Sequence, residues 1–192
     1  MQQIPKARLE AFSDGVVAIL ITIMVLELHA PQGSGPSALR PLLPVFSSYV
    51  LSFLYLGIYW NNHHHLLHAA KHINGRIMWA NLHLLFWLSL FPFVTAWIGR
   101  TQAAACPTAL YGAVFFMAAI AYFILQSSIV ALEGKDSTLR RALGRDWKGK
   151  LSPVCYVLAM ALAFVNPWWS NAIYVFVALL WVVPDRRIEK LT

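Results

Sequence analysis

Long apolar runs separated by short polar connectors are the feature that most limits how this chain can fold. Runs of about 17 to 25 apolar residues are long enough for a helix to cross a bilayer, and they recur from residue 9 to residue 184. Because backbone groups in hydrocarbon must be hydrogen-bonded within the protein, such runs indicate helices. The 59% hydrophobic and 12% charged content also lies outside the range of soluble domains. We therefore expect an all-α integral membrane protein.

We predict six transmembrane helices in one domain that covers residues 1–192. The predicted spans are 9–29, 43–68, 77–98, 108–132, 151–166 and 168–184. The dipeptide Asn166-Pro167 predicts a tight turn, which would make the last two helices an antiparallel hairpin.

Lysine and arginine are distributed unevenly between the connectors. The N-terminus, the connectors 69–76 and 133–150 and the C-terminus hold 13 of the 15 basic residues, and only Arg40 and Arg100 lie on the other side. Cytoplasmic connectors of membrane proteins carry this excess, so both termini should be cytoplasmic. Topology thus explains the net charge of +7, and we expect no nucleic acid partner. Cys106 and Cys155 have no metal-ligand spacing.

The first apolar segment combines an aliphatic stripe with charges at both of its ends. At about 100° per residue the stripe occupies one narrow face, and its members are Phe12, Gly15, Ile19, Thr22 or Ile23, and Leu26. The opposite face carries Glu10, Ser13, Asp14, Val17 and Leu28. Periodicity alone leaves open whether the stripe faces another copy, a pore axis, lipid or the protein core.

Charged groups within an apolar helix require partners. Arg8 and Asp14 lie at the same end of the helix and could pair, because an unpaired buried carboxylate is costly. We therefore expect a buried polar network at this end. The alternative is a helix cap, in which Ser13 or Asp14 accepts from free backbone amides.

Histidines crowd the end of the second span. They are His63, His64, His65, His68 and His72. The pairs His64/His68 and His68/His72 have the i, i+4 spacing that can direct two imidazoles toward one metal, although interfacial histidines also meet water or headgroups. Trp79, Asn81 and His83 follow on the third span, so that Asp14, one histidine and Asn81 could meet at one depth.

These motifs resemble the signature of the transmembrane protein 175 family of potassium channels. The first part is Arg8, then Phe12-Ser13-Asp14, then an aliphatic helix that ends in Glu27. Supporting motifs are Tyr59-Trp60, Asn62-His63, Trp79, Asn81-Leu82 and Phe91-Pro92-Phe93. The resemblance covers residues 6–100, whereas the last three helices agree only in number, length and hydrophobicity.

The resemblance implies a prokaryotic homotetramer of six-helix subunits in the plasma (inner) membrane, with a pore lined by the first helix. It implies that Arg8, Phe12, Ser13 and Asp14 hold this helix through a polar network that includes Trp60, His63 and Asn81. If the positions of the family are carried over to this sequence, the pore constriction falls at Ile19, and Thr22 and Leu26 lie further out. Ile23, on the same side of the helix, is the alternative constriction.

The function that this resemblance implies is a leak-type cation channel with weak to moderate potassium selectivity. The chain lacks the Thr-Val-Gly-Tyr-Gly sequence of ordinary potassium channels, so Ile19 would form a hydrophobic gate and Thr22 a polar ring. Glu27 would either attract cations at the outer mouth or pair within the bundle. We expect membrane lipid and potassium ions as partners, no cofactor or metal, and no enzymatic activity.

Two other functions remain open from the residues alone. The histidine cluster and Asp14 could belong to a proton-coupled or metal-handling carrier, whose transport would saturate. A haem- or metal-dependent oxidoreductase would instead give a coloured protein.

Overall fold

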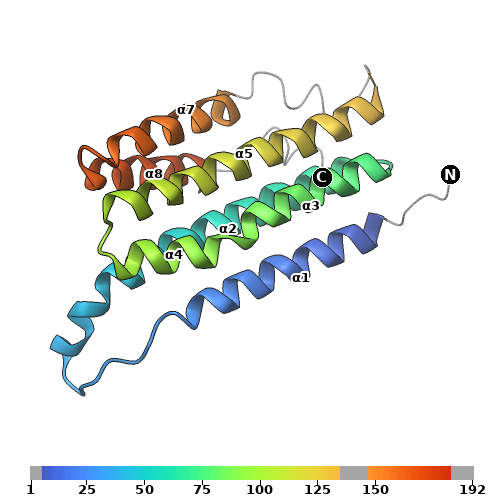
Figure 1. The fold of residues 1–192 in the computed structure, drawn as a ribbon. Coiled ribbons are helices and arrows are strands. Elements are labelled where there is room, and N and C mark those ends of the chain that lie inside the picture. The colour runs from blue at the N-terminus through green and yellow to red at the C-terminus, as the bar shows by residue number, and fades with distance from the viewer. Residues whose placement is uncertain (1–5, 135–146, 183–192) are drawn as a thin grey trace.

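The computed structural model describes residues 6–134 and 147–182, and these residues form only helices and the turns between them. Figure 1 shows the helices running roughly side by side along one long axis. Their bounds are α1 Lys6–Val25, the 3-10 helix η1 Pro36–Leu42, α2 Leu43–Ala69, α3 Gly75–Ser89, α4 Phe91–Arg100, α5 Ala105–Glu133, α7 Trp147–Leu162 and α8 Pro167–Val182.

Three helical stretches of the described residues are long and apolar enough to cross a membrane: Pro36–Ala69, Gly75–Arg100 and Ala105–Glu133. The other three predicted spans are helical but differ in length or charge. α1 carries several charges in its first turns. α7 and α8 are described over 16 residues each, and α7 begins and α8 ends at an edge of the described residues. An all-helical membrane protein is therefore supported, whereas six full spans are not established.

Several helix boundaries differ from the predicted spans, and α7 ends at Leu162 rather than at residue 166. Two of the differences have a local cause. α1 ends at Val25, where Leu26 and Leu28 donate to carbonyls three residues back and tighten the chain into a turn. The predicted third span is two helices with Leu90 between them. Pro92 has no backbone N–H to continue the α3 ladder, and it lies in the first turn of α4, where none is needed.

Other boundaries follow from local chemistry. Asn74 caps α3, because its side-chain oxygen accepts from the Ile77 amide at 3.0 Å. α7 and α8 form the predicted hairpin around Asn166-Pro167, where the Asn166 side chain accepts from the Trp168 amide. The residues predicted as 183–184 of the last span, and most of the basic 133–150 connector, lie outside the described residues.

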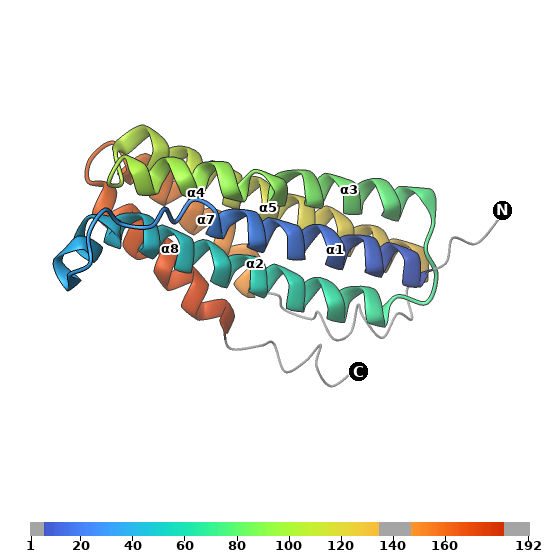
Figure 2. The same ribbon diagram turned by 90° about the horizontal axis from the view of Figure 1, so that it is seen from below.

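The helices are arranged in layers, as the two views in Figures 1 and 2 show. α1 packs on α2, α3 and α4, while α5 lies between these helices and the α7–α8 hairpin. The beginning of α1 meets the end of α2 through the Lys6 Nζ, which donates to the His68 carbonyl at 2.7 Å. The end of α5 meets the α2–α3 connection, where Glu133 accepts from the Lys71 amide. These four helix ends therefore lie at one end of the bundle.

Aromatic rings fill the space between α2, α5, α7 and α8. Tyr55 and Phe115 approach within 4.0 Å between ring centroids, and Tyr111, Tyr156 and Tyr174 surround them. The Tyr55 hydroxyl donates to the Tyr174 carbonyl at 2.7 Å, and the Tyr174 hydroxyl donates to the Thr108 carbonyl at 3.0 Å. Buried hydroxyls that are paired in this way stabilise the packing without an unsatisfied polar group.

Gly112 is required where α5 approaches α8. A Cβ at this position would lie 2.1 Å from the Tyr174 Oη and 3.0 Å from the Met160 Cγ. The hydrogen bond to Thr108 and the surrounding rings hold Tyr174 in place. The Tyr174 side chain therefore has little room to move aside.

We expect Gly112→Ala to lower the free energy of unfolding by about 1–3 kcal/mol, the usual cost of overpacking a core. Gly57→Ala on α2 is the matched control, because nothing lies within 4 Å of its added Cβ. Thermal unfolding of the detergent-solubilised variants measures both. Equal melting temperatures for the two variants would contradict this account of the contact.

Candidate functional site

The helix α1 has a packed face and an open face. Its buried residues are Leu9, Ser13, Val17, Leu20 and Met24, which contact α2, α3 and α4. The residues of the exposed stripe, as defined here, are Phe12, Gly15, Ile19, Thr22, Ile23 and Leu26, and all of them are exposed. The aliphatic stripe predicted from the sequence therefore lies on the face that the described part of the chain leaves uncovered.

Ile19 stands at the middle of the exposed stripe. Its side chain is 57% exposed, whereas Leu20, the next residue, is buried against the bundle. Ile23 is less exposed than Ile19 and Leu26 is more exposed, because Leu26 lies in the turn that follows the helix. The stripe is thus helical from Phe12 to Ile23 and continues into the turn at Leu26.

Thr22 supplies the polar group on the exposed stripe near Ile19. Its Oγ1 donates to the Ile19 carbonyl at 2.9 Å, one turn earlier in the helix. Because this bond uses the hydroxyl proton, the oxygen lone pairs are left to accept from water or to coordinate a cation. The Thr22 side chain is exposed, so these lone pairs are accessible from the open face.

A buried polar cluster holds the packed face of α1, and we call it the polar anchor: Ser13, His63 and Asn81. The Asn81 Nδ2 donates to the Ser13 Oγ at 2.9 Å, and the Ser13 hydroxyl donates to the Leu9 carbonyl. The His63 Nε2 donates to the Asn81 Oδ1 at 2.7 Å. Asn81 is completely buried. The polar anchor therefore joins α1, α2 and α3 at one depth through paired groups.

Asp14 makes a separate contact beside the polar anchor. Its Oδ1 accepts from the Trp60 Nε1 at 3.0 Å, which is a second link between α1 and α2. It is thus Ser13 and not Asp14 that bonds to Asn81. Trp60, which the family resemblance assigned to the polar network of α1, therefore bonds to Asp14 and not to the polar anchor.

Arg8 and Phe12 are exposed and lie outside the polar anchor. The structure has no ion pair between Arg8 and Asp14, although the sequence suggested that they could pair. Six residues at about 100° each place their side chains about 120° apart around the helix. Lys6 pairs with Glu10 instead, at 3.8 Å and the favourable i, i+4 spacing.

Glu27 pairs within the bundle. Its Oε2 accepts from the Arg100 Nη2 at the end of α4, and both side chains are partly open to solvent. Of the two roles considered for Glu27, the structure thus supports pairing within the bundle. The ion pair also neutralises much of the charge that an outer mouth would have gained from this carboxylate.

The histidine cluster is mostly on the surface of α2. The rings of Trp60, His64 and His68 stack along the helix, with 6.1 Å between the centroids of the two histidines. Within residues 6–134 and 147–182, no three His, Cys, Asp or Glu side chains gather closely enough to hold a metal ion. The geometry therefore gives no specific support to a metal-handling site.

A second series of buried hydrogen-bonded side chains, formed by Thr95, Ser52 and Tyr111, was not predicted from the sequence. The Thr95 Oγ1 donates to the Ser52 Oγ at 2.6 Å, and Ser52 shares a 2.7 Å hydrogen bond with the Tyr111 hydroxyl. These groups join α4, α2 and α5, and Thr95 also lies 3.9 Å from the Met24 sulfur of α1. The available signal was a Ser, Thr or Tyr within an apolar run, a residue type that commonly bonds between membrane helices.

Comparison of the sequence with known proteins shows a similarity that covers these residues. Residues 8–92 match the sequence profile of the family described as "Endosomal/lysosomal potassium channel TMEM175". This stretch contains the exposed stripe, the polar anchor and the Trp60–Asp14 contact.

Whole-length relatives extend the similarity beyond α3. The chain is 54% identical to "Potassium channel HX13_20290" of a Chryseobacterium species over 96% of each chain. It is 30% identical to "Potassium channel B446_29190" of Streptomyces collinus, over 90% of this chain and 89% of that one. The crystal structure of a lysosomal potassium-selective channel TMEM175 homologue from Chamaesiphon minutus matches with a TM-score of 0.78 and 26% identity. That match covers 94% of this chain and 97% of the other.

We expect Asn81→Leu to destabilise the protein by about 1–3 kcal/mol, because the buried His63 N–H then has no acceptor. Asn171→Leu is the matched control, since the half-buried Asn171 amide donates only to a carbonyl of its own helix among the described residues. Thermal unfolding compares the two variants. The interpretation is wrong if the substitution at Asn81 costs no more than the one at Asn171.

Proposed function

Because this chain belongs to the TMEM175 family of ion channels, we propose that it is a potassium-selective, leak-type cation channel made of four copies. The family fixes the coarser statement: the chain is a multi-pass membrane channel protein of a prokaryotic type and not an enzyme. The finer proposal concerns potassium selectivity, the tetramer and the residues that line its pore.

The observation that carries the proposal is the exposed stripe of α1. This helix is held on one side by hydrogen bonds from α2 and α3, while its other side presents aliphatic groups that no described residue covers. These hydrogen bonds fix the rotation of α1 about its own axis, so one defined face of the helix points away from the bundle. Four such faces around an axis would enclose a narrow apolar passage.

Ile19 forms the proposed constriction. Four isoleucine side chains offer no ligand to an ion, so a cation passes only when the constriction is wide enough to hold water. Hydrophobic constrictions of this kind gate by losing their water. Partial dehydration at such a ring costs less for potassium than for the more strongly hydrated sodium.

Thr22 supplies the proposed polar ring next to Ile19. Its proton already bonds to the Ile19 carbonyl, so its oxygen is oriented as an acceptor. Four such oxygens could replace part of the hydration shell of a cation, the role that backbone carbonyls have in ordinary potassium channels. Leu26 then lines the outer end, and Ile23 is the alternative constriction.

The distribution of charge supports the proposed orientation. The beginning of α1, the α2–α3 connection and the end of α5 lie at one end of the bundle (Figure 2), and Lys6, Lys71 and Arg76 belong to this end. Basic residues favour the cytoplasmic side. We therefore place the polar anchor toward the cytoplasm and the Glu27–Arg100 ion pair at the outer side of the prokaryotic plasma membrane.

Ion flux into liposomes tests the function directly. Purified protein should pass potassium down its gradient with a rate proportional to the driving force, and no flux from intact tetramers would contradict the proposal. Saturable transport that is lost in His64→Ala would instead indicate a carrier. The mass of the solubilised complex tests the tetramer separately.

Ile19→Asn should raise the conductance roughly tenfold, the effect of lowering the barrier by about 1.4 kcal/mol, because polar side chains keep the constriction wet. Single-channel recording in planar bilayers measures this change. Ile124→Asn is the control, because Ile124 is an exposed isoleucine on α5, away from the exposed stripe, and this change should leave the conductance unchanged. An unaltered current in Ile19→Asn would place the constriction elsewhere.

Thr22→Val keeps the shape of the side chain and removes the oxygen. We expect the potassium-to-sodium permeability ratio to fall about two- to tenfold, the range for one lost neutral hydrogen bond. Reversal potentials under bi-ionic conditions measure the ratio. Thr22→Ser retains the oxygen and should keep the ratio, so equal losses in both variants would rule out a role of the hydroxyl.

A further inference from the structure

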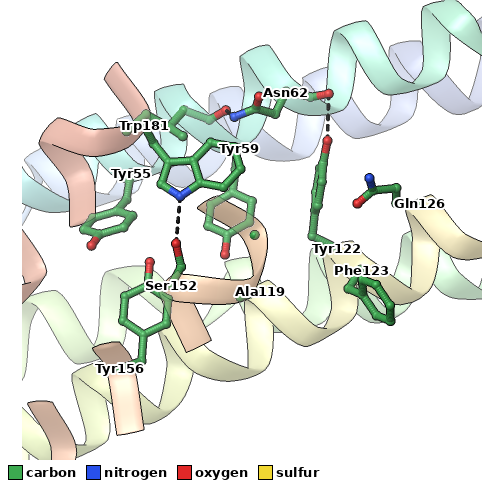
Figure 3. A pocket seen from close by; sticks show the side chains of 12 residues that line it. Tyr55, Tyr59, Asn62, Ala119, Tyr122, Phe123, Gln126, Ser152, Tyr156 and Trp181 are labelled. Carbon is green, nitrogen blue, oxygen red and sulfur yellow. Dashed lines mark hydrogen bonds between the residues drawn. The ribbon is translucent and has the colours of Figure 1, made fainter. Parts of the chain in front are cut away.

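A pocket lies on the far side of α2 from the pore-lining helix, among α2, α5, α7 and α8 (Figure 3). It encloses about 560 Å³ together with its open mouth. Half of its twelve lining residues are aromatic: Tyr55, Tyr59, Tyr122, Phe123, Tyr156 and Trp181.

The Gln126 amide is one of the polar groups that line the pocket. Gln126 lines the pocket from α5 and is only 7% exposed, yet none of the described residues forms a hydrogen bond with its side chain. Figure 3 shows this amide turned toward the Tyr122 ring. Its amide atoms are not among the side-chain atoms that are fully buried without a partner, so they stay accessible from the pocket and a molecule bound there can pair with them.

Two further polar groups of the pocket wall can form additional hydrogen bonds. The Tyr59 hydroxyl has no hydrogen-bond partner among the described residues, and Figure 3 shows it turned toward Ala119 and Ser152. The Asn62 Nδ2 donates to the Ile58 carbonyl at 2.9 Å, which leaves the side-chain oxygen of Asn62 as an acceptor. The pocket therefore offers both donors and acceptors.

Other residues hold the wall in place. The Trp181 Nε1 donates to the Ser152 Oγ at 2.8 Å, and Ser152 donates to the Lys148 carbonyl. The Tyr122 hydroxyl donates to the Asn62 carbonyl at 3.1 Å. Because these bonds fix the indole and phenol rings, the pocket exists before any ligand binds.

The lining residues select the chemical class of the ligand. None of the residues that line the pocket carries a formal charge, which disfavours a charged ligand. Flat aromatic walls favour a planar ring. Phe123, 64% exposed, stands at the edge of the pocket on the outer surface of α5, where a molecule dissolved in the membrane can reach it.

We propose that this pocket binds a small, uncharged, membrane-soluble aromatic molecule that carries a hydroxyl or carbonyl group, with Gln126 as its hydrogen-bonding residue. The site is separate from the exposed stripe of α1. The proposal therefore stands or fails independently of ion conduction.

Two probes that differ in a single hydroxyl test the role of Gln126. Equilibrium binding of 1-naphthol and of naphthalene to the full chain in lipid nanodiscs is measured by the fluorescence of the probes. Gln126→Leu should weaken the binding of 1-naphthol about three- to tenfold and leave the binding of naphthalene unchanged. Comparing each probe between the two proteins cancels its partition into lipid.

A second pair of variants tests the location. Ala119→Phe fills the pocket and should abolish the saturable binding of both probes, whereas Ala161→Phe places the same side chain on the exposed surface of α7 and should not. Loss of binding in both variants, or none in either, would overturn the proposed site. An equal effect of Gln126→Leu on both probes, or no effect on either, would show an apolar groove that accepts any hydrocarbon, including a lipid tail, and would also overturn the proposal.

Discussion

The hydrogen bonds that Asn81 makes to Ser13 and His63 decide how α1 is rotated, and the other features of the open face depend on that rotation. Lipid tails are as apolar as leucine, so burial of aliphatic groups does not select which face of a membrane helix packs inward. α1 has aliphatic residues all around it beyond Asp14. The polar anchor and the Trp60–Asp14 bond distinguish its two sides. Without these hydrogen bonds, the side chains of Ile19 and Leu20 would be almost equally suited to the buried and the exposed side of the helix.

The molecule is held together differently on its two sides. α5, α7 and α8 pack on α2 through interlocking aromatic rings whose hydroxyls bond to backbone carbonyls. α1 contacts α2, α3 and α4 through small and aliphatic side chains and a few polar bonds. The large ring contacts make one side a close-packed body. The proposed pore helix is attached to that body through α2, α3 and α4.

Much of this arrangement could be predicted from the sequence because its signals are local. The exposed stripe follows from a 3.6-residue period, and the polar anchor follows from polar residues within apolar runs. The α7–α8 hairpin follows from Asn166-Pro167. Membership of a channel family also agrees with the resemblance carried by the Phe12-Ser13-Asp14 motif.

The remainder could not be predicted because it depends on contacts between distant segments. The pairing of Glu27 with Arg100 joins positions 73 residues apart. Arg8 and Asp14, which the sequence suggested could pair, share one end of the helix but lie about 120° apart around it, and they do not pair. The pocket with Gln126 is formed where α5, α7 and α8 meet α2, and the sequence motifs that were recognised covered only residues up to about 100.

The Glu27–Arg100 ion pair has a consequence for how α1 can move. The polar bonds that join α1 and its following turn to the other helices lie toward the two ends, at Lys6, Ser13 and Asp14 on one side and at Glu27 on the other. A helix that is held near both ends cannot tilt as a rigid body, but it can bend. Its backbone is then displaced most midway between the two ends. Ile19 and Thr22 occupy that middle portion. In the proposed four-copy pore, widening at this level corresponds to an outward bend of α1 between its polar bonds, while both of its ends stay where they are.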